Sequence, residues 1–282
     1  MTLFKEKINS TNRREKAWKN GRLVFFQNLP DANYWDNYWN DTITKEYYET
    51  YEEGQLNEFS GIFDKYLKVT DSILEAGCGN ARYIIALCAK GFNKIDGIEW
   101  GEKTVEKVKK IYPDLSIQVG DVTNTGKPDS SYDAYISLGV VEHRLEGPEP
   151  FLIEANRVLK PSGYAFITVP YVNPLRTLKA KLGQYADVTP NASFFQYAFR
   201  RAEFRNFLHQ AGFEVIEAHG IAGYYGLLEE IPGWLNFIDG LPGGWAIKQY
   251  LKRAAWIDIF GHMIIFVCKK CEINRYHLSS NS

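Results

Sequence analysis

A strand, a glycine-rich turn and a helix follow one another between Ser72 and Ala89, and this unit constrains the fold more than any other part of the chain. The apolar residues 72–74 predict a buried strand, residues 75–81 (Glu-Ala-Gly-Cys-Gly-Asn-Ala) predict the turn, and residues 82–89 predict the helix. Glycine lets the backbone approach a ligand closely, and a helix N-terminus presents unpaired N–H groups. The unit is therefore typical of nucleotide binding, although a Gly-x-Gly pair alone also occurs in plain turns.

The spacing of the residues that follow strengthens this interpretation. The next predicted strand, residues 94–99, ends at Glu99, about 20 residues beyond the glycines, where a carboxylate reaches ribose hydroxyls in units of this kind. More strands are predicted over 115–119, 132–138, 164–170, 214–218 and 261–268. Polar residues follow several of these strands, and ligands of open parallel sheets bind at the C-terminal ends of the strands. The sequence therefore predicts an α/β fold with a ligand site at that edge.

Five motifs occur in an order that resembles the class I S-adenosylmethionine-dependent methyltransferases, and most closely the small-molecule branch that includes the ubiquinone O-methyltransferases. The motifs are Leu74–Gly79, Gly97–Glu99, Gly120–Val122, Val140–His143 and Arg157–Gly163. The resemblance covers roughly residues 55 to 270. It implies a Rossmann-like, doubly wound sheet of seven strands, mostly parallel with an antiparallel last strand, plus helical N-terminal and late insertions. It also implies S-adenosyl-L-methionine as the cofactor.

The resemblance implies roles for individual residues along this edge of the sheet. The methionine part would meet the glycine turn, the ribose would meet Glu99, and the adenine amino group would meet Asp121. The implied cofactor-binding residues are Glu75, Gly77, Cys78, Gly79, Glu99, Trp100, Asp121, Val122 and Leu138. Ala81 stands where a third glycine is often found, and this substitution is tolerable if the residue has a negative φ.

Charge and cysteine content narrow the function classes. The 282-residue chain has a net charge of -1, and its pI near 6.5 gives no general attraction to nucleic acid. Residues 1–30 are expected to form a basic N-terminal arm. The four cysteines, including the C-x-x-C pair Cys268 and Cys271, are expected to be reduced and free of metal. A cytoplasmic location is expected because the cysteines are expected to be reduced. The sequence also lacks an apolar run of the ~20 residues that span a bilayer.

Two additions to the predicted 68–282 methyltransferase domain are rich in aromatic residues. Residues 31–67 predict a helical cap whose aromatic side chains would contact the cofactor or the acceptor, although simple packing is the alternative. Residues 222–259 form a late insertion rich in Gly, Pro and Trp. A lid over an apolar or aromatic acceptor is favoured for it, and a peripheral membrane contact or a dimer contact are the alternatives. The cap, residues 171–197 and the insertion are expected to meet over the methyl group.

Proton removal is expected only for some acceptors. His143 follows the fourth strand, where the acceptor would arrive, and is the predicted catalytic base; a structural histidine bonded to the loop backbone is the alternative. A carboxylate or an ionised phenol would need no base. Transfer to oxygen of a small molecule is favoured. A non-catalytic binding module and a nicotinamide-dependent oxidoreductase remain alternatives, although the chain lacks a Gly-x-Gly-x-x-Gly turn and a Tyr-x-x-x-Lys pair.

Overall fold

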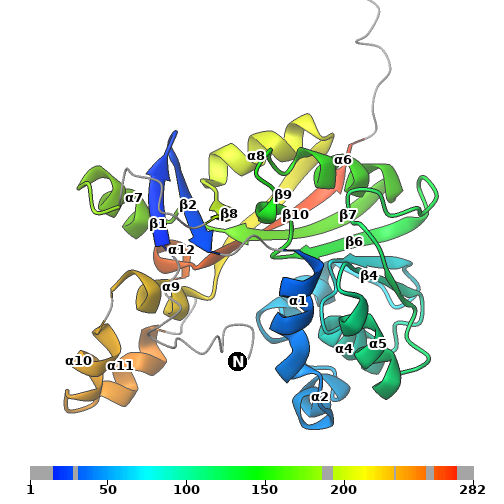
Figure 1. Ribbon diagram of the computed structural model, residues 1–282, viewed down its shortest axis with the longest axis horizontal. Helices are drawn as coiled ribbons and strands as arrows, with labels where there is room; N and C mark the ends of the chain where they lie inside the picture. The colour runs from blue at the N-terminus through cyan, green and yellow to red at the C-terminus, as the bar shows by residue number, and fades with distance from the viewer. Residues whose placement is uncertain (1–14, 28–30, 186–192, 232, 252–256, 272–282) are drawn as a thin grey trace, which may run out of the picture.

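A seven-stranded sheet forms the centre of the protein in a computed structural model that describes residues 15–27, 31–185, 193–231, 233–251 and 257–271 (Figure 1). Its strands are β3 (Ile73–Ala76), β4 (Ile95–Glu99), β5 (Ile117–Val119), β6 (Tyr132–Leu138), β7 (Leu159–Pro170), β9 (Phe213–Ile221) and β10 (Met263–Lys270). Their order is β5-β4-β3-β6-β7-β10-β9. The neighbours from β5 to β7 pair in parallel, and β10 runs antiparallel to both β7 and β9. The predicted fold class is confirmed.

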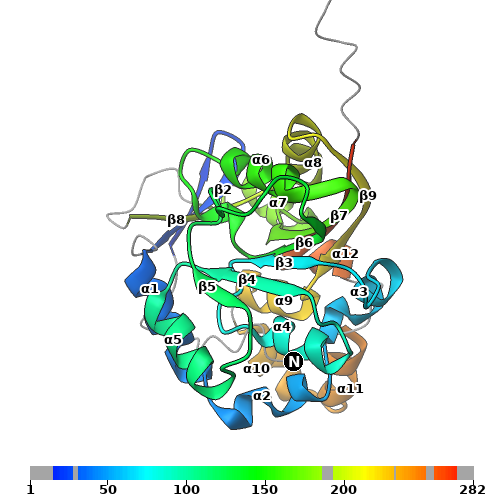
Figure 2. The ribbon, with the colours of Figure 1, turned by 90° about the vertical axis from the view of Figure 1, so that its right-hand side faces the viewer.

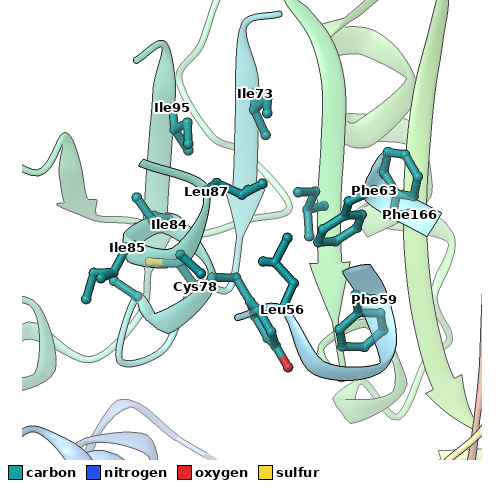
Figure 3. Close-up of a cluster of buried hydrophobic side chains, with 14 of the residues drawn as sticks. Leu56, Phe59, Phe63, Ile73, Cys78, Ile84, Ile85, Leu87, Ile95 and Phe166 are labelled. Carbon is teal, nitrogen blue, oxygen red and sulfur yellow. The ribbon is translucent and has the colours of Figure 1, made fainter. Parts of the chain in front are cut away.

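Helices cover both faces of this sheet because successive strand residues point to opposite sides. Ile73 and Phe166 pack among α3 (Ser60–Tyr66), α4 (Arg82–Ala89) and α5 (Glu102–Ile111), and Figure 3 shows Phe63 of α3 beside Phe166. Leu74 and Ile167 pack instead among α6 (Glu149–Val158) and α8 (Arg201–Gln210). Figure 2 shows α6 and α8 on one side of the strands and α4 on the other. The alternation of apolar residues therefore builds two cores on one sheet.

A small second sheet corrects the expectation of an N-terminal arm for part of residues 1–30. Strands β1 (Glu15–Lys19) and β2 (Arg22–Gln27) form an antiparallel hairpin, and β2 also pairs with β8 (Ser193–Ala198). The hairpin turns at Asn20 and Gly21, which both have positive φ, as tight hairpins require. Leu23 and Phe25 are fully buried, so burial of apolar side chains outweighs the basic character of this segment. Residues 1–14 and 28–30 lie outside the described residues.

The predicted cap consists of short helices bound to the glycine turn and to α5. These are α1 (Ala32–Trp39), the 3-10 turn η1 (Asn40–Thr42), α2 (Lys45–Glu52), the 3-10 turn η2 (Asn57–Phe59) and α3. The Asp36 carboxylate accepts hydrogen bonds from the backbone N–H and hydroxyl of Thr104 on α5, at 2.8 and 2.9 Å. The Tyr48 hydroxyl donates to the carbonyl oxygen of Asn80 in the turn at 2.7 Å. These bonds fix the aromatic face of α1 over the sheet edge.

The described residues of the late insertion form four helices, which lie beside the sheet in Figure 1. They are α9 (Gly223–Glu230), α10 (Trp234–Asp239), α11 (Gly244–Leu251) and α12 (Ile257–Phe260), while α7 (Pro174–Lys181) follows β7. Phe237 and Trp245 leave 61% and 75% of their surface exposed, so α10 and α11 present apolar side chains to solvent. In the described part of the chain, no helix combines the length and the apolar character needed to cross a membrane.

Candidate active site

The glycine turn is held against the end of β4 by backbone hydrogen bonds. The N–H groups of Gly77 and Cys78 both donate to the carbonyl oxygen of Ile98, at 2.8 and 3.0 Å. The N–H of Gly79 donates to Glu99 Oε2 at 2.8 Å, and the N–H of Gly101 donates to Glu99 Oε1 at 2.9 Å. Burial raises the pKa of Glu99, and these backbone amides oppose the rise because they favour the carboxylate. The acid at the strand end therefore organises the turn as well as facing the site.

Two glycines of the turn have the positive φ that favours glycine. At Gly77, with φ of 79°, a Cβ atom would lie 2.5 Å from Val140 Cγ2. At Gly79, with φ of 53°, a Cβ atom would lie 2.6 Å from the Trp39 ring of the cap. The expectation of a negative φ at Ala81 is wrong, because its φ is 58°. The close approach of Val140 to Gly77 and of the cap to Gly79 is therefore the reason that this loop needs small residues.

A larger cavity of about 220 Å³ opens at the C-terminal ends of β3, β4 and β6. Seven residues predicted from the sequence line it: Gly77, Glu99, Trp100, Asp121, Val122, Leu138 and His143. Trp35 and Trp39 add aromatic walls from α1. Asp121 Oδ1 accepts hydrogen bonds from the backbone N–H and the hydroxyl of Thr123, both at 2.8 Å, so this carboxylate is held in place by its own turn. The cavity thus joins acidic groups at two strand ends with apolar walls.

Three other residues that the sequence predicts to bind the cofactor do not line either cavity. Glu75 lies within β3 and is 3% exposed; burial raises its pKa to about 8, the Glu99 charge adds to the rise, and Arg82 opposes it. Cys78 packs beneath the turn in the hydrophobic core, as Figure 3 shows, and Gly79 is covered by Trp39. Their predicted contacts with a cofactor stay predictions.

A smaller cavity of about 110 Å³ adjoins the larger one and shares five lining residues with it: Trp35, Trp39, Leu138, Gly139 and His143. Its other walls come from elements distant in sequence. Tyr38 belongs to the cap, Phe195 and Gln196 belong to β8, and Met263 begins β10. The cap and the 171–197 stretch therefore meet beside the shared residues, as the sequence predicts.

The lid expectation for the late insertion stays a prediction. Among the described residues of 222–259, none lines either cavity, whereas Ile221 and His262 at the two flanks of the insertion line the smaller one. The helices α9 to α12 lie beside the strands because α9 packs against the start of β10 (Figure 1). Residues 232 and 252–256 lie outside the described residues.

His143 stands at the junction of the two cavities. Its Nδ1 lies 2.9 Å from the carbonyl oxygen of Phe195, and its ring contacts the rings of Trp35 and Phe195 edge-on at 5.0 and 4.8 Å between centroids. A carbonyl oxygen only accepts, so Nδ1 carries the proton and Nε2 is the nitrogen that accepts one. Nε2 lies 3.9 Å from Oε1 of Glu142, a carboxylate that is 2% exposed. The backbone bond predicted for a structural histidine is present, and it also fixes the tautomer of a base.

Three ionisable residues of the smaller cavity, Arg82, Glu142 and His262, were missed as site residues in the sequence. Arg82 begins α4 directly after the turn and is 7% exposed; its guanidinium lies over the rings of Trp39 and Tyr83, and its Nε has no hydrogen-bond partner among the described residues. Its place one residue after the glycine turn was a usable signal. His262 directly precedes β10 and is 8% exposed. Only the antiparallel return of β10 brings His262 to this edge, and no local motif marks it.

The comparisons with known proteins agree with the fold. Residues 74–167 match the family model described as a methyltransferase domain. This match, the sheet order and the turn geometry make the segment similar to the class I S-adenosylmethionine-dependent methyltransferase domains.

Three known proteins are similar to this chain to different extents. A Mycolicibacterium smegmatis protein named a probable S-adenosylmethionine-dependent methyltransferase is 30% identical over 182 residues, which are 64% of each chain. The Danio rerio eEF1A lysine and N-terminal methyltransferase is 28% identical over 153 residues, and the match spans 51% of this chain and only 22% of that protein. A chain from the complex of the Haloferax volcanii Trm112 methyltransferase activator superposes with a TM-score of 0.56 at 18% identity, covering 86% of this chain and 96% of that one. This last likeness is one of fold.

Proposed function

We propose that the chain transfers a methyl group from S-adenosyl-L-methionine to a small acceptor with an apolar or planar part, and that the favoured acceptor atom is oxygen. The observation that carries this proposal is the pair of adjoining cavities with shared walls at Trp35, Trp39 and His143. One cavity has the acidic strand ends suited to an adenosine group, and the other has aromatic walls suited to an apolar acceptor. The resemblance to ubiquinone O-methyltransferases, which the sequence predicts, is part of this proposal.

The residues of the larger cavity fit S-adenosylmethionine chemically. Glu99 has two carboxylate oxygens, each bound to one backbone amide, and each oxygen retains a second lone pair for a ribose hydroxyl. Asp121 offers an acceptor to the adenine amino group, with Val122 beside it. Arg82 lines the smaller cavity where it adjoins the larger one, and its Nε, which lacks a partner among the described residues, would take the carboxylate of the methionine part. When bound, the sulfonium supplies an electrophilic methyl group.

The chain's own residues would then mainly position the acceptor. Alignment of a nucleophile with an electrophilic carbon lowers the barrier by ordering the two reactants in advance. The rings of Trp35 and Trp39 would hold a planar acceptor and exclude water from the junction. Gly139, whose φ is 74°, keeps the junction open because it places no side chain there. His143, the base predicted from the sequence, stands at this junction with Nδ1 bound to the Phe195 carbonyl oxygen.

Cofactor choice and methyl transfer are tested in two steps on the full chain. Calorimetric titration with S-adenosylmethionine and with NADH should show binding of the first alone, because the turn and Glu99 recognise the nucleoside and Arg82 the amino acid. The chain is then incubated with S-[methyl-³H]adenosylmethionine and a fractionated cell extract. We expect tritium in the small-molecule fraction. Binding of NADH instead of S-adenosylmethionine, or binding without any transfer, would reject this function in favour of an oxidoreductase or a binding module.

A protein amine is the second candidate acceptor, and Glu142 is the observation that favours it. A buried carboxylate beside aromatic rings attracts an ammonium group. One of the similar proteins is named as a lysine and N-terminal methyltransferase of eEF1A. The same tritium experiment separates the two candidates, because label in the protein fraction, lost after Glu142→Gln, would favour the amine acceptor. Label in the small-molecule fraction would favour the first.

A further inference from the structure

His262 and Glu229 form a carboxylate–histidine pair at the wall of the smaller cavity. His262 Nδ1 lies 2.8 Å from Glu229 Oε2, and His262 also lines the cavity in which the acceptor is proposed to bind. Glu229 Oε2 accepts from Arg176 Nη2 as well, and Arg176 Nη2 lies 3.3 Å from His262 Nδ1. The shorter contact of Nδ1 is the one to the carboxylate oxygen, which favours the proton on Nδ1 and leaves Nε2 to accept a proton. It also stabilises the imidazolium that forms when Nε2 is protonated. The pair therefore has the arrangement of a general base.

A close contact between α9 and the chain that enters β10 positions Glu229 beside His262. Gly226 of α9 approaches the backbone that enters β10 so closely that a Cβ atom there would lie 1.8 Å from the Phe260 carbonyl oxygen and 2.9 Å from the His262 nitrogen. Glu229 follows three residues later, about one helical turn along the same side. The first helix of the late insertion thus supplies the carboxylate behind His262, although the insertion lines neither cavity in the described residues.

Buried cations keep the Glu229 carboxylate ionised. Arg176 on α7 is fully buried and donates to Glu229 Oε2 at 2.5 Å and to Glu230 Oε1 at 2.9 Å. Lys16 of β1 lies 3.0 Å from Glu229 Oε1. Burial raises the pKa of Glu229, but His262, Lys16 and Arg176 outweigh it and hold that pKa well below its ordinary value. The small sheet, α7 and α9 all contribute to this arrangement.

His262 and His143 differ in where the nearest carboxylate lies relative to the accepting nitrogen. The partner of His143 Nδ1 is the neutral carbonyl of Phe195, which orients the ring without opposing a full charge. The accepting nitrogen of His143 faces Glu142 at 3.9 Å, so an incoming hydroxyl would share that space with a carboxylate. His262 has its carboxylate, Glu229, behind the ring at Nδ1. The charge that stabilises the imidazolium therefore does not compete with the acceptor.

We propose that His262 takes the proton of a hydroxyl acceptor and that Glu229 acts as its positioning residue. This inference rests on the proposed function. In the step, the acceptor O–H bond breaks and its proton moves to His262 Nε2, while the oxygen forms a bond to the methyl carbon of S-adenosylmethionine. The methyl carbon–sulfur bond breaks, and its electron pair remains on sulfur. The products are a methyl ether, S-adenosylhomocysteine and an imidazolium, which returns its proton to water. His143 holds the aromatic wall at the junction.

The tautomer of His262 tests the pair without any substrate. The full chain is labelled with ¹⁵N-histidine, and the ring nitrogens of its five histidines are observed by NMR, with His262 assigned by comparison with His262→Gln. We expect the Nδ1–H tautomer in the unmodified chain and a mixture of both tautomers in Glu229→Gln. Glu230→Gln is the matched control, because Glu230 shares Arg176 but its described bonds do not include His262. It should leave the tautomer unchanged.

Methyl transfer to the tritium-labelled product of the cell extract tests the proton-transfer step. At saturating S-adenosylmethionine, His262→Asn should lower the rate about 100-fold or more, and Glu229→Gln by a smaller factor, with no change in cofactor affinity. His143→Asn should cost less than His262→Asn. The inference is overturned if His262→Asn keeps the full rate, or if Glu229→Gln folds and leaves the tautomer unchanged. Absence of transfer by the unmodified chain would instead reject the proposed function, whatever the tautomer.

Discussion

Replacing Glu99 by glutamine should weaken both cofactor binding and the fold, by amounts that follow from its contacts. The two carboxylate oxygens accept the N–H groups of Gly79 and Gly101 at 2.8 and 2.9 Å in a site that is 4% exposed. In Glu99→Gln, one amide keeps an acceptor and the other faces an NH₂ group. A buried donor left without an acceptor costs about 1–3 kcal/mol. We expect a loss of that size in the free energy of unfolding, measured with urea.

Cofactor affinity should fall because hydrogen bonds to a charged acceptor contribute about 1.5–3 kcal/mol. That range corresponds to a loss of about tenfold to just over a hundredfold in the dissociation constant for S-adenosylmethionine. Asp96→Asn is the matched control on the same strand. Its carboxylate accepts from the Tyr132 hydroxyl at 2.5 Å and from Lys127 at 3.1 Å, and it lines neither cavity. It should lower stability and leave affinity unchanged. A folded Glu99→Gln protein with unchanged affinity would refute the ribose assignment.

Three further predictions follow from the contacts around the site. Asp121→Asn keeps an acceptor for the Thr123 turn, so calorimetry should show a smaller loss of cofactor affinity than for Asp121→Ala; equal losses would contradict the adenine contact. Glu75 has a pKa of about 8 in the folded state, against an ordinary value of 4.5, so it keeps its proton on folding. The free energy of unfolding should therefore fall as the pH rises from 5 to 8. Urea titrations of Glu75→Gln should lack this fall. The double variant Phe237→Ser, Trp245→Ser should leave cofactor affinity unchanged, because neither residue lines either cavity. Both side chains are exposed, so a membrane contact through the insertion predicts that this variant sediments less with phosphatidylcholine–phosphatidylserine vesicles.

The central sheet and the cofactor edge could be predicted because their signals are local. The glycine turn needs residues without a Cβ, and the acid that ends the next strand stands at a fixed chain distance from it. The spacing alone predicts Glu99 as a residue of this edge, and the structure adds that its carboxylate anchors Gly79. The Asn20–Gly21 hairpin had an equally local signal, and the basic composition of the N-terminal residues obscured it.

The residues of the proposed acceptor cavity could not be predicted in the same detail, because segments distant in the sequence form its walls. His262 reaches the cavity only through the antiparallel return of β10, and its carboxylate partner depends on the fit of Gly226 against the chain that enters that strand. The lid expectation stays a prediction, and the described residues of the insertion lie away from both cavities for a related reason. A long connection rich in Gly, Pro and Trp indicates that an insertion exists, but its direction is set by tertiary packing of α9.

Methyl transfer by the full chain is the most direct test of this account. S-adenosylhomocysteine and tritiated product are quantified in the same sample after incubation with S-[methyl-³H]adenosylmethionine and the active extract fraction. The account predicts that the two products appear in equal amounts and that Glu99→Gln slows both together at limiting cofactor. Binding of S-adenosylmethionine with neither product formed, across all extract fractions, would contradict it and identify the fold as a binding module.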